Sequence, residues 1–184
     1  RGFRTVGFDV DARKVDMLDK GESYIKHIPS ARIRKAVETG HLNATVDHTR
    51  VSECDAIIIA VPTPLNKNRE PDLSFIVSTC EAIAKHLKRG HIVALESTTY
   101  PGTTDEVVVP ILEKSGFKVN EDFYVAFSPE REDPTRVNFT TETIPKVVGA
   151  TSPDGLAVAE RLYQQIIVRT VPVSSTRVAE ATKL

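Results

Sequence analysis

The feature that most constrains the fold is a regular alternation of short apolar segments with helical segments along the chain. The apolar segments are rich in β-branched residues and are bounded by turn residues, which is typical of buried strands. The predicted strands are Thr5–Asp11, Leu42–Val46, Asp55–Val61, His91–Glu96, Tyr124–Phe127, Lys146–Gly149 and Val168–Val173. Strands that alternate with helices form right-handed βαβ units. The sequence therefore predicts an α/β fold with a doubly wound, mostly parallel sheet.

Helix signals fill most of the segments between these strands, and a long loop is predicted to end at Pro145, before the strand Lys146–Gly149. The predicted helices are Ala12–Lys20, Ala31–Thr39, a short turn over Thr49–Cys54, Leu73–Arg89, Thr104–Ser115, one from Ser152-Pro153-Asp154 to about Gln165, and one from Ser174 onward. Within the long helix, Cys80 shares a face with Ile76 and Ile83 at helical spacing. We therefore interpret Cys80 as a core residue. The same interpretation applies to Cys54, which precedes an apolar strand, so neither thiol is predicted to be a nucleophile.

Composition excludes several functional classes. The 184 residues carry a net charge of -1 with acids and bases interspersed, which gives no electrostatic basis for binding nucleic acid or an anionic membrane. The longest apolar run, 56–61, is far too short to cross a bilayer. Two cysteines and five scattered histidines indicate neither a disulfide framework nor a metal site. The sequence predicts a cytoplasmic protein with reduced thiols.

The first predicted strand ends in acidic residues, and Asp9 is its candidate binding residue. Dinucleotide-binding folds place a ribose-binding carboxylate at the end of the second strand, about 20 residues after a glycine-rich phosphate loop. The alternative is a solvated acid near a helix start. Eight residues precede Asp9, so that loop is not among these residues. We expect the chain to begin inside the first crossover helix, which Gly2 would end, and to be an internal part of a longer protein.

Three further predicted strands end in polar segments, at Pro62–Pro64, Ser97–Thr99 and Ser128–Glu130. Because ligands bind at the carboxyl ends of parallel strands, we expect these segments to share one edge of the sheet with Asp9. Thr63 and Thr98 can each offer a hydroxyl group to a cofactor or substrate. The alternative for both is the capping of a following turn or helix, which is common for threonine.

Glu130 and Lys183 are the charged candidates. Pro129 restricts the backbone before Glu130, so the carboxylate is directed, as suits a general base or a water-orienting group. The alternative is a surface ion pair with Arg131. Lys183 by itself is typical of a solvated helix lysine. The residues alone therefore predict a nucleotide- or dinucleotide-binding α/β domain of enzymatic character, and they do not identify the reaction.

Six motifs follow one another along the chain: GFDVD at 7–11, AVPTPL at 60–65, ESTTYPGTT at 96–104, FSPERED at 127–133, TIPKVVGA at 143–150 and AEATKL at 179–184. Together they resemble the UDP-glucose/GDP-mannose dehydrogenase family. SPERED and TIPKVVG resemble the branch that oxidises UDP-N-acetylhexosamines such as UDP-N-acetylglucosamine. The resemblance implies a Rossmann-like NAD-binding domain over residues 1–173, incomplete at both ends. It also implies that residues 174–184 begin a long central dimerisation helix.

The family resemblance implies a reaction in which two NAD molecules act in turn to oxidise the C6 hydroxyl of a nucleotide sugar to a carboxylate. A cysteine holds the aldehyde as a thiohemiacetal and then as a thioester, which water hydrolyses. The product is a uronic acid for surface polysaccharide synthesis. The cysteine and the phosphate loop lie outside this stretch, so we expect residues 1–184 alone to be inactive and to bind NAD weakly. The intact protein is expected to be a homodimer or a higher homo-oligomer.

The motifs also imply cofactor-binding residues by position. Asp9 matches the acid that holds the adenosine ribose, and Lys14 matches a residue beside it. A carboxylate there favours NAD over NADP, because it repels a 2′-phosphate. Val61 and Thr63 match cofactor contacts. Thr98 matches a residue that borders the nicotinamide.

The implied catalytic residues are Thr98, Glu130 and Lys183. Thr98 matches the threonine that positions the hydrolytic water, and Glu130 matches the glutamate that activates it. Lys183 matches the lysine that stabilises the developing oxyanion. The residues implied to contact the UDP-sugar substrate are Glu130, Arg131, Glu132 and Lys183.

Other functions stay open on the sequence. In one alternative, the protein performs the same oxidation on UDP-glucose or GDP-mannose instead of a UDP-N-acetylhexosamine. A hydroxyacid or 6-phosphogluconate-type dehydrogenase has a similar first domain, but it does not explain the SPERED motif. A non-catalytic nucleotide-sensing domain would use the same strand ends to bind a ligand without reaction.

Overall fold

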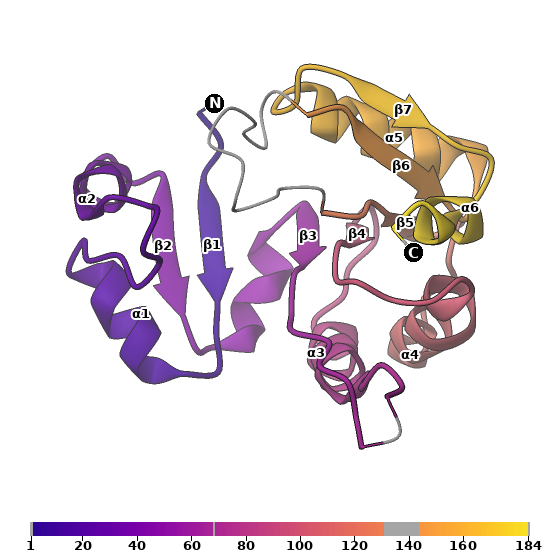
Figure 1. Cartoon of the computed structure of the whole chain (residues 1–184), viewed down its shortest axis with the longest axis horizontal. Coiled ribbons are helices and arrows are strands. Elements are labelled where there is room, and N and C mark those ends of the chain that lie inside the picture. The colour runs from indigo at the N-terminus through magenta and orange to yellow at the C-terminus, as the bar shows by residue number, and fades with distance from the viewer. Residues whose placement is uncertain (1, 68, 131–143, 184) are drawn as a thin grey trace. The chain divides into compact units, whose positions relative to one another are not determined.

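A computed structural model describes residues 2–67, 69–130 and 144–183 of the chain (Figure 1). The chain forms two compact units, Arg1–Arg50 and Val51–Leu184. The short 3-10 helix η1 (His48–Glu53) crosses the boundary between them. The predictions for Arg131 and Glu132 lie outside the described residues.

The first unit consists of two parallel strands and two helices. It contains β1 (Thr5–Phe8), α1 (Ala12–Asp19), α2 (Ser30–Glu38) and β2 (Leu42–Thr45). β1 pairs with β2 in parallel, with Thr5 opposite Leu42. The carboxylate of Asp11 accepts a hydrogen bond from the amide of Arg13 and so caps the start of α1. The strands and helices predicted for this region are confirmed, except that the first strand ends at Phe8 and not at Asp11.

The second unit is built on a five-stranded sheet with the order β3-β4-β5-β6-β7. Its strands are β3 (Ala56–Ile59), β4 (Ile92–Leu95), β5 (Tyr124–Phe127), β6 (Lys146–Ala150) and β7 (Thr170–Pro172). Its helical segments are α3 (Ser74–Ala84), η2 (Thr104–Val108), α4 (Val109–Leu112), η3 (Glu113–Ser115), α5 (Pro153–Gln164) and α6 (Thr176–Ala181). The predicted α/β class with a mostly parallel sheet is confirmed.

One pair of strands in this sheet is antiparallel. β3, β4 and β5 run parallel, and so do β6 and β7, but β5 and β6 run in opposite directions, with Phe127 opposite Gly149. The sequence predicted a βαβ series and a mostly parallel sheet, but it did not identify which pair of strands is antiparallel. Antiparallel neighbours do not need a crossover helix. The reversal places the start of β6, rather than its end, beside the carboxyl end of β5.

The core of this unit lies on both faces of the central strands. Ala94 and Ala126 pack with Ala159 and Tyr163 of α5, and their sequence neighbours Val93, Leu95, Val125 and Phe127 point to the opposite face, fully buried. Figure 1 shows α5 on one side of these strands and α3 and α4 on the other. The sheet is therefore covered by helices on both faces, as expected for a doubly wound fold.

Three local predictions need correction. β3 is the end strand of its sheet, and Ile58 is 46% exposed, so the expected burial on both faces does not hold there. The predicted helix Thr104–Ser115 consists of π, α and 3-10 segments, because Pro110 has no amide to continue a regular hydrogen-bond ladder. The helix predicted to reach Arg89 ends at Ala84 and continues as turns.

Candidate functional site

Asp9 lies directly after β1, and two partners hold its carboxylate. The amide of Asp11 donates to Oδ1 at 2.9 Å, and Nζ of Lys14 donates to Oδ2 at 3.0 Å. Partial burial opposes ionisation of Asp9, but the Asp11 amide and the Lys14 ammonium outweigh it and hold its pKa below the usual value. The side chain is therefore an oriented, ionised carboxylate at the carboxyl end of a parallel strand. This is the chemistry that binds ribose hydroxyls in dinucleotide-binding sheets.

Lys14 is itself positioned by two groups. Besides the ion pair with Asp9, its Nζ lies 5.5 Å from the ring centroid of Tyr24, within the range of a cation–π interaction. The hydrogen bond to Asp9 raises the pKa of Lys14. Lys14 thus orients Asp9, and the two predicted cofactor-binding residues of the first unit lie in direct contact.

In the second unit, Ser97 connects the ends of β3 and β4. Its hydroxyl accepts a hydrogen bond from the amide of Val61 at 2.9 Å and donates one to the carbonyl of Val61 at 2.8 Å. The backbone of Val61, a predicted cofactor contact, is therefore fixed by a side chain from the neighbouring strand end. Sequence reasoning placed Ser97 in a polar strand-end segment but did not recognise this role.

The threonines near these strand ends differ in exposure. Thr63 is half-buried and Thr98 is exposed, so burial excludes neither residue from its predicted contact. Thr99 is only 2% exposed, and its Oγ1 has no hydrogen-bond partner among the residues that the structure describes. Of Thr98 and Thr99, Thr98 is therefore the threonine that this loop exposes to solvent.

Glu130 and Lys183 are brought together although 53 residues separate them. Nζ of Lys183 donates a hydrogen bond to the backbone carbonyl of Glu130. The carboxylate of Glu130 lies near a second lysine, Lys146, with 3.7 Å between Oε2 and Nζ. Two of the three predicted catalytic residues thus meet at the carboxyl end of β5.

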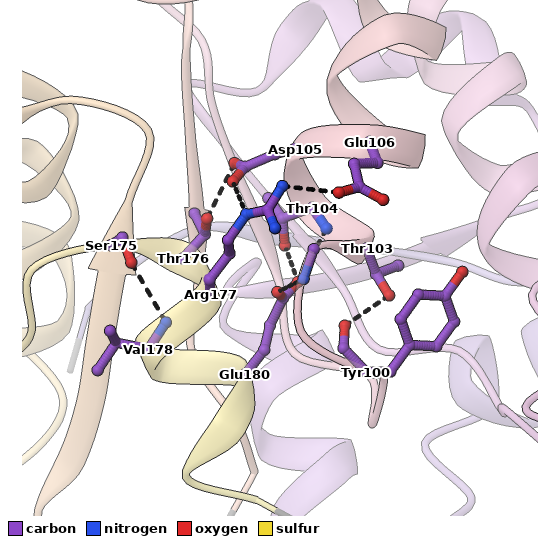
Figure 2. A network of polar contacts seen from close by, with 11 residues as sticks. Tyr100, Thr103, Thr104, Asp105, Glu106, Ser175, Thr176, Arg177, Val178 and Glu180 are labelled. Carbon is purple, nitrogen blue, oxygen red and sulfur yellow. Dashed lines mark hydrogen bonds and ion pairs between the residues drawn. The ribbon is translucent and has the colours of Figure 1, made fainter.

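A polar contact fixes α6, which ends two residues before Lys183, to the loop after β4, on which Thr98 lies (Figure 2). Glu180 of α6 is fully buried, and its carboxylate accepts hydrogen bonds from the amide of Gly102 at 2.6 Å and the amide of Thr104 at 2.8 Å. The hydroxyl of Thr104 donates a third at 2.7 Å. Hydrogen bonds to a carboxylate are among the stronger ones in proteins. Glu180 therefore sets the position of α6 relative to the loop after β4.

Two further interactions support this contact. Arg177 pairs with Asp105 at 3.4 Å and with Glu106 at 2.6 Å, and the Thr176 hydroxyl donates to Asp105 at 2.9 Å (Figure 2). A glycine in β6 permits the close approach on the other side of α6. A Cβ at Gly149 would overlap the carbonyl of Ser175 and lie 2.9 Å from the Cβ of Ala179.

The cysteines do not take part in these sites. Cys80 is fully buried, and burial raises the pKa of its thiol to about 12, so it stays protonated and inert at neutral pH. Cys54 is half-buried, and its carbonyl lies 2.9 Å from Nε2 of the buried His91. Within the described ranges there is no cluster of side chains suited to a metal ion, and no helix there has the length and apolarity to cross a bilayer.

The fold and the strand-end residues together define a nucleotide-binding α/β domain. A sequence model described as UDP-glucose/GDP-mannose dehydrogenase family, NAD binding domain, matches residues 1–167. The chain therefore belongs to this family, and residues 1–167 match its NAD-binding domain, which confirms the resemblance seen in the motifs.

Individual relatives agree with this assignment. A UDP-N-acetyl-D-glucosamine 6-dehydrogenase of Pseudomonas aeruginosa is 38% identical over 181 residues, which are 97% of this chain and 42% of that protein. The crystal structure of an NDP-N-acetyl-D-galactosaminuronic acid dehydrogenase from Methanosarcina mazei Go1 has a TM-score of 0.90 at 33% identity, over 98% of this chain and 40% of that one.

A GDP-mannose dehydrogenase of Pseudomonas aeruginosa, crystallised as a ternary complex, has a TM-score of 0.91 at 30% identity. This similarity covers 100% of the present chain and 43% of that protein. The chain thus spans about two fifths of the length of the curated relatives that it matches.

Proposed function

We propose that this chain is the cofactor-binding part of an enzyme that oxidises the C6 hydroxyl of a UDP-N-acetylhexosamine to the uronic acid. The observation that carries the proposal is the meeting of Glu130 and Lys183 at the carboxyl end of β5. The SPERED and TIPKVVG motifs, and relatives named as dehydrogenases of N-acetylated nucleotide sugars, support the substrate class.

The chemistry is a four-electron oxidation in two hydride transfers. NAD, when bound, supplies the hydride acceptor for each. The C6 alcohol loses a hydride and a proton to give an aldehyde, and a cysteine thiol from outside residues 1–184 adds to it. Loss of a second hydride, together with the hydroxyl proton of this adduct, gives a thioester, and water then cleaves the carbon–sulfur bond to release the carboxylate and the thiol. Covalent capture keeps the aldehyde from escaping.

Asp9 and Lys14 have the clearest role in cofactor binding. The ionised carboxylate of Asp9 would accept hydrogen bonds from the adenosine ribose, and Lys14 holds it in place. Val61 and Thr63 would contact the cofactor from the loop after β3, where Ser97 fixes the backbone of Val61.

The remaining residues act on the second half of the reaction. Thr98, exposed on the loop after β4, would position the water that attacks the thioester, and Glu130 would accept its proton. Lys183 would stabilise the oxyanion that develops on the thioester carbonyl, because a fixed ammonium offsets the growing negative charge. Arg131 and Glu132 follow Glu130 in sequence and are proposed to contact the sugar.

Turnover of the full-length protein tests this proposal. UDP-N-acetylglucosamine and its manno and galacto epimers should each be assayed beside UDP-glucose and GDP-mannose. We expect two NADH per sugar oxidised, and the highest kcat/KM for an N-acetylated UDP-sugar. One NADH per sugar would contradict the mechanism, and a higher kcat/KM for UDP-glucose or GDP-mannose would replace the substrate assignment. Binding of a UDP-sugar without any turnover would favour the nucleotide-sensing alternative.

The assembly and setting of the enzyme belong to the same proposal. α6 is proposed to begin the long helix through which two subunits of the intact protein associate, with residues 1–173 as the cofactor domain. A cytoplasmic location and a role in surface polysaccharide synthesis stay predictions. Light scattering of the full-length protein tests the expected dimer or higher oligomer.

A further inference from the structure

Lys146 is a buried lysine to which none of the proposed catalytic steps assigns a role. It is the first residue of β6 and is only 5% exposed. Its Nζ lies 3.3 Å from Oε1 of Glu96 and 3.7 Å from Oε2 of Glu130, and 5.3 Å from the ring centroid of Tyr163. Burial of an ammonium group is costly unless opposite charges and hydrogen-bond acceptors surround it. Lys146 has such an environment, and one of the carboxylates in it belongs to Glu130, a proposed catalytic residue.

Glu96 is the fixed partner in this cluster. The phenol of Tyr163 donates a hydrogen bond to Oε1 of Glu96 at 2.7 Å. Burial, with the nearby charge of Glu96, raises the pKa of Tyr163 well above its usual value, so the phenol remains a donor at neutral pH. The side chain of Glu96 is only 14% exposed, whereas that of Glu130 is 41% exposed. Lys146 therefore connects an anchored, buried carboxylate to one that reaches solvent.

The antiparallel pairing of β5 and β6 explains why Lys146 reaches this place. Phe127 lies opposite Gly149, so the chain before Gly149 runs alongside the residues after Phe127. The hydroxyl of Ser128 donates to the carbonyl of Val147 at 2.7 Å and holds this register. If β6 ran parallel to β5, its first residue would lie at the opposite edge of the sheet.

Two lysines thus act on different atoms of Glu130. Lys183 binds its backbone carbonyl, and Lys146 faces its carboxylate. We infer that Lys146 is a positioning residue that aims the Glu130 carboxylate at the water of the hydrolytic step. The inference rests on the proposed function, because the hydrolytic step belongs to it. The competing explanation is that Lys146 only neutralises the buried charge of Glu96.

The test uses the full-length enzyme with the Lys146→Met substitution. Without the ammonium, the Glu130 carboxylate loses its orientation, so hydrolysis should slow while both hydride transfers proceed. We expect a rapid first turnover with two NADH per active site, followed by a kcat reduced about tenfold to a hundredfold, the effect of a displaced catalytic group. The thioester should accumulate and appear in the intact-protein mass as an adduct of the uronyl product.

Further variants separate positioning from charge neutralisation. Lys146→Arg keeps the positive charge and should restore part of the kcat. Lys146→Met alone leaves Glu96 buried without its cation and should lower the thermal stability. The double variant Lys146→Met with Glu96→Gln removes both buried charges, so its thermal stability should return toward that of the wild type while thioester release stays slow. Lys88→Met is the matched control, because Lys88 pairs with Asp55 at 3.9 Å on an exposed surface, and this change should leave kcat unaltered.

Several results would overturn the inference. Thioester release at the normal rate in Lys146→Met, or in the double variant, would show that Lys146 only neutralises the charge of Glu96. An equal loss in both hydride transfers and in hydrolysis would indicate general damage to the site. A wild-type enzyme that yields two NADH but never forms a thioester would also refute it. By contrast, a wild type that turns over no nucleotide sugar would refute the proposed function itself, and this inference with it.

Discussion

Glu180 and Thr104 are joined by two hydrogen bonds to a single carboxylate oxygen. The amide of Thr104 donates to Oε1 of Glu180 at 2.8 Å, and its hydroxyl donates to the same atom at 2.7 Å. Both residues are fully buried, and 76 positions separate them in the sequence. This pair is the centre of the contact between α6 and the loop after β4 (Figure 2). The geometry of the proposed site depends on it, because Thr98 lies on this loop and Lys183 follows the end of α6 by two residues.

The Glu180→Gln substitution should destabilise this contact. A carboxylate accepts all three hydrogen bonds, whereas a glutamine side chain turns an NH2 group toward at least one backbone donor. We expect a loss of about 1–3 kcal/mol in the free energy of unfolding, the usual effect of a buried polar group without a partner. Chemical denaturation measures this change. Glu106→Gln is the control, since its exposed ion pair with Arg177 should contribute less than about 1 kcal/mol, and equal effects of the two variants would contradict the assignment.

The Gly149→Ala substitution should separate α6 from β6. A methyl group there would overlap the carbonyl of Ser175 and approach the Cβ of Ala179 to 2.9 Å. We expect about 1–3 kcal/mol of destabilisation, as for other overpacked cores, and a lower kcat because Lys183 moves with the helix. In Gly7→Ala, by contrast, the nearest atom to the new methyl is the Asn43 carbonyl oxygen at 3.9 Å, an ordinary contact. Denaturation of both variants tests the prediction, and unchanged stability of Gly149→Ala would refute it.

The Asp9→Asn substitution should weaken binding of NAD by the intact protein and reduce its preference over NADP. An amide accepts fewer hydrogen bonds from the ribose, so we expect the Kd for NAD to rise about tenfold. It also no longer repels a 2′-phosphate, so the ratio of the two affinities should fall. Titration calorimetry with both cofactors measures this. Asp16→Asn, on the exposed side of α1, is the control. An unchanged ratio would exclude Asp9 from the ribose site.

The lowered pKa of Asp9 predicts a pH dependence in the first unit. The folded state favours the ionised form, so its stabilising contribution is fully present above the unfolded pKa of about 3.9. That contribution is lost as the pH falls through the still lower pKa of the folded state. Hydrogen exchange of the β1 amides should therefore differ between wild type and Asp9→Asn at pH 6, and the difference should shrink as the pH falls below about 3.9. A constant difference across this range would contradict the prediction.

Much of the fold follows from local sequence patterns. Apolar runs, glycine stops and capping residues located nearly every strand and helix, because these signals depend on neighbouring residues. The candidate residues Asp9, Thr98 and Glu130 were found because each lies near the carboxyl end of a predicted strand. The proximity of Glu130 and Lys183 agrees with the roles that the family resemblance implied for them, although those roles stay predictions.

The residues that sequence reasoning missed depend on long-range geometry. Lys146 is beside Glu130 only because β6 runs antiparallel to β5, and strand direction leaves no mark in the pattern of side chains. Glu180 resembles any exposed helix glutamate in sequence, and its burial is set by backbone amides 76 and 78 positions away. Both residues lie inside motifs that carry the family resemblance, which was the one available signal.

The paired hydrogen bonds between Ser97 and Val61 have a practical meaning for anyone who redesigns cofactor preference. A single hydroxyl serves as donor and acceptor to both backbone groups of one residue, and alanine or valine at position 97 can do neither. The loops after β3 and β4 are therefore not independent modules for mutagenesis. Libraries that vary Thr63 and its neighbours should keep Ser97 constant, or should vary both loops together and select the combinations that restore the bridge.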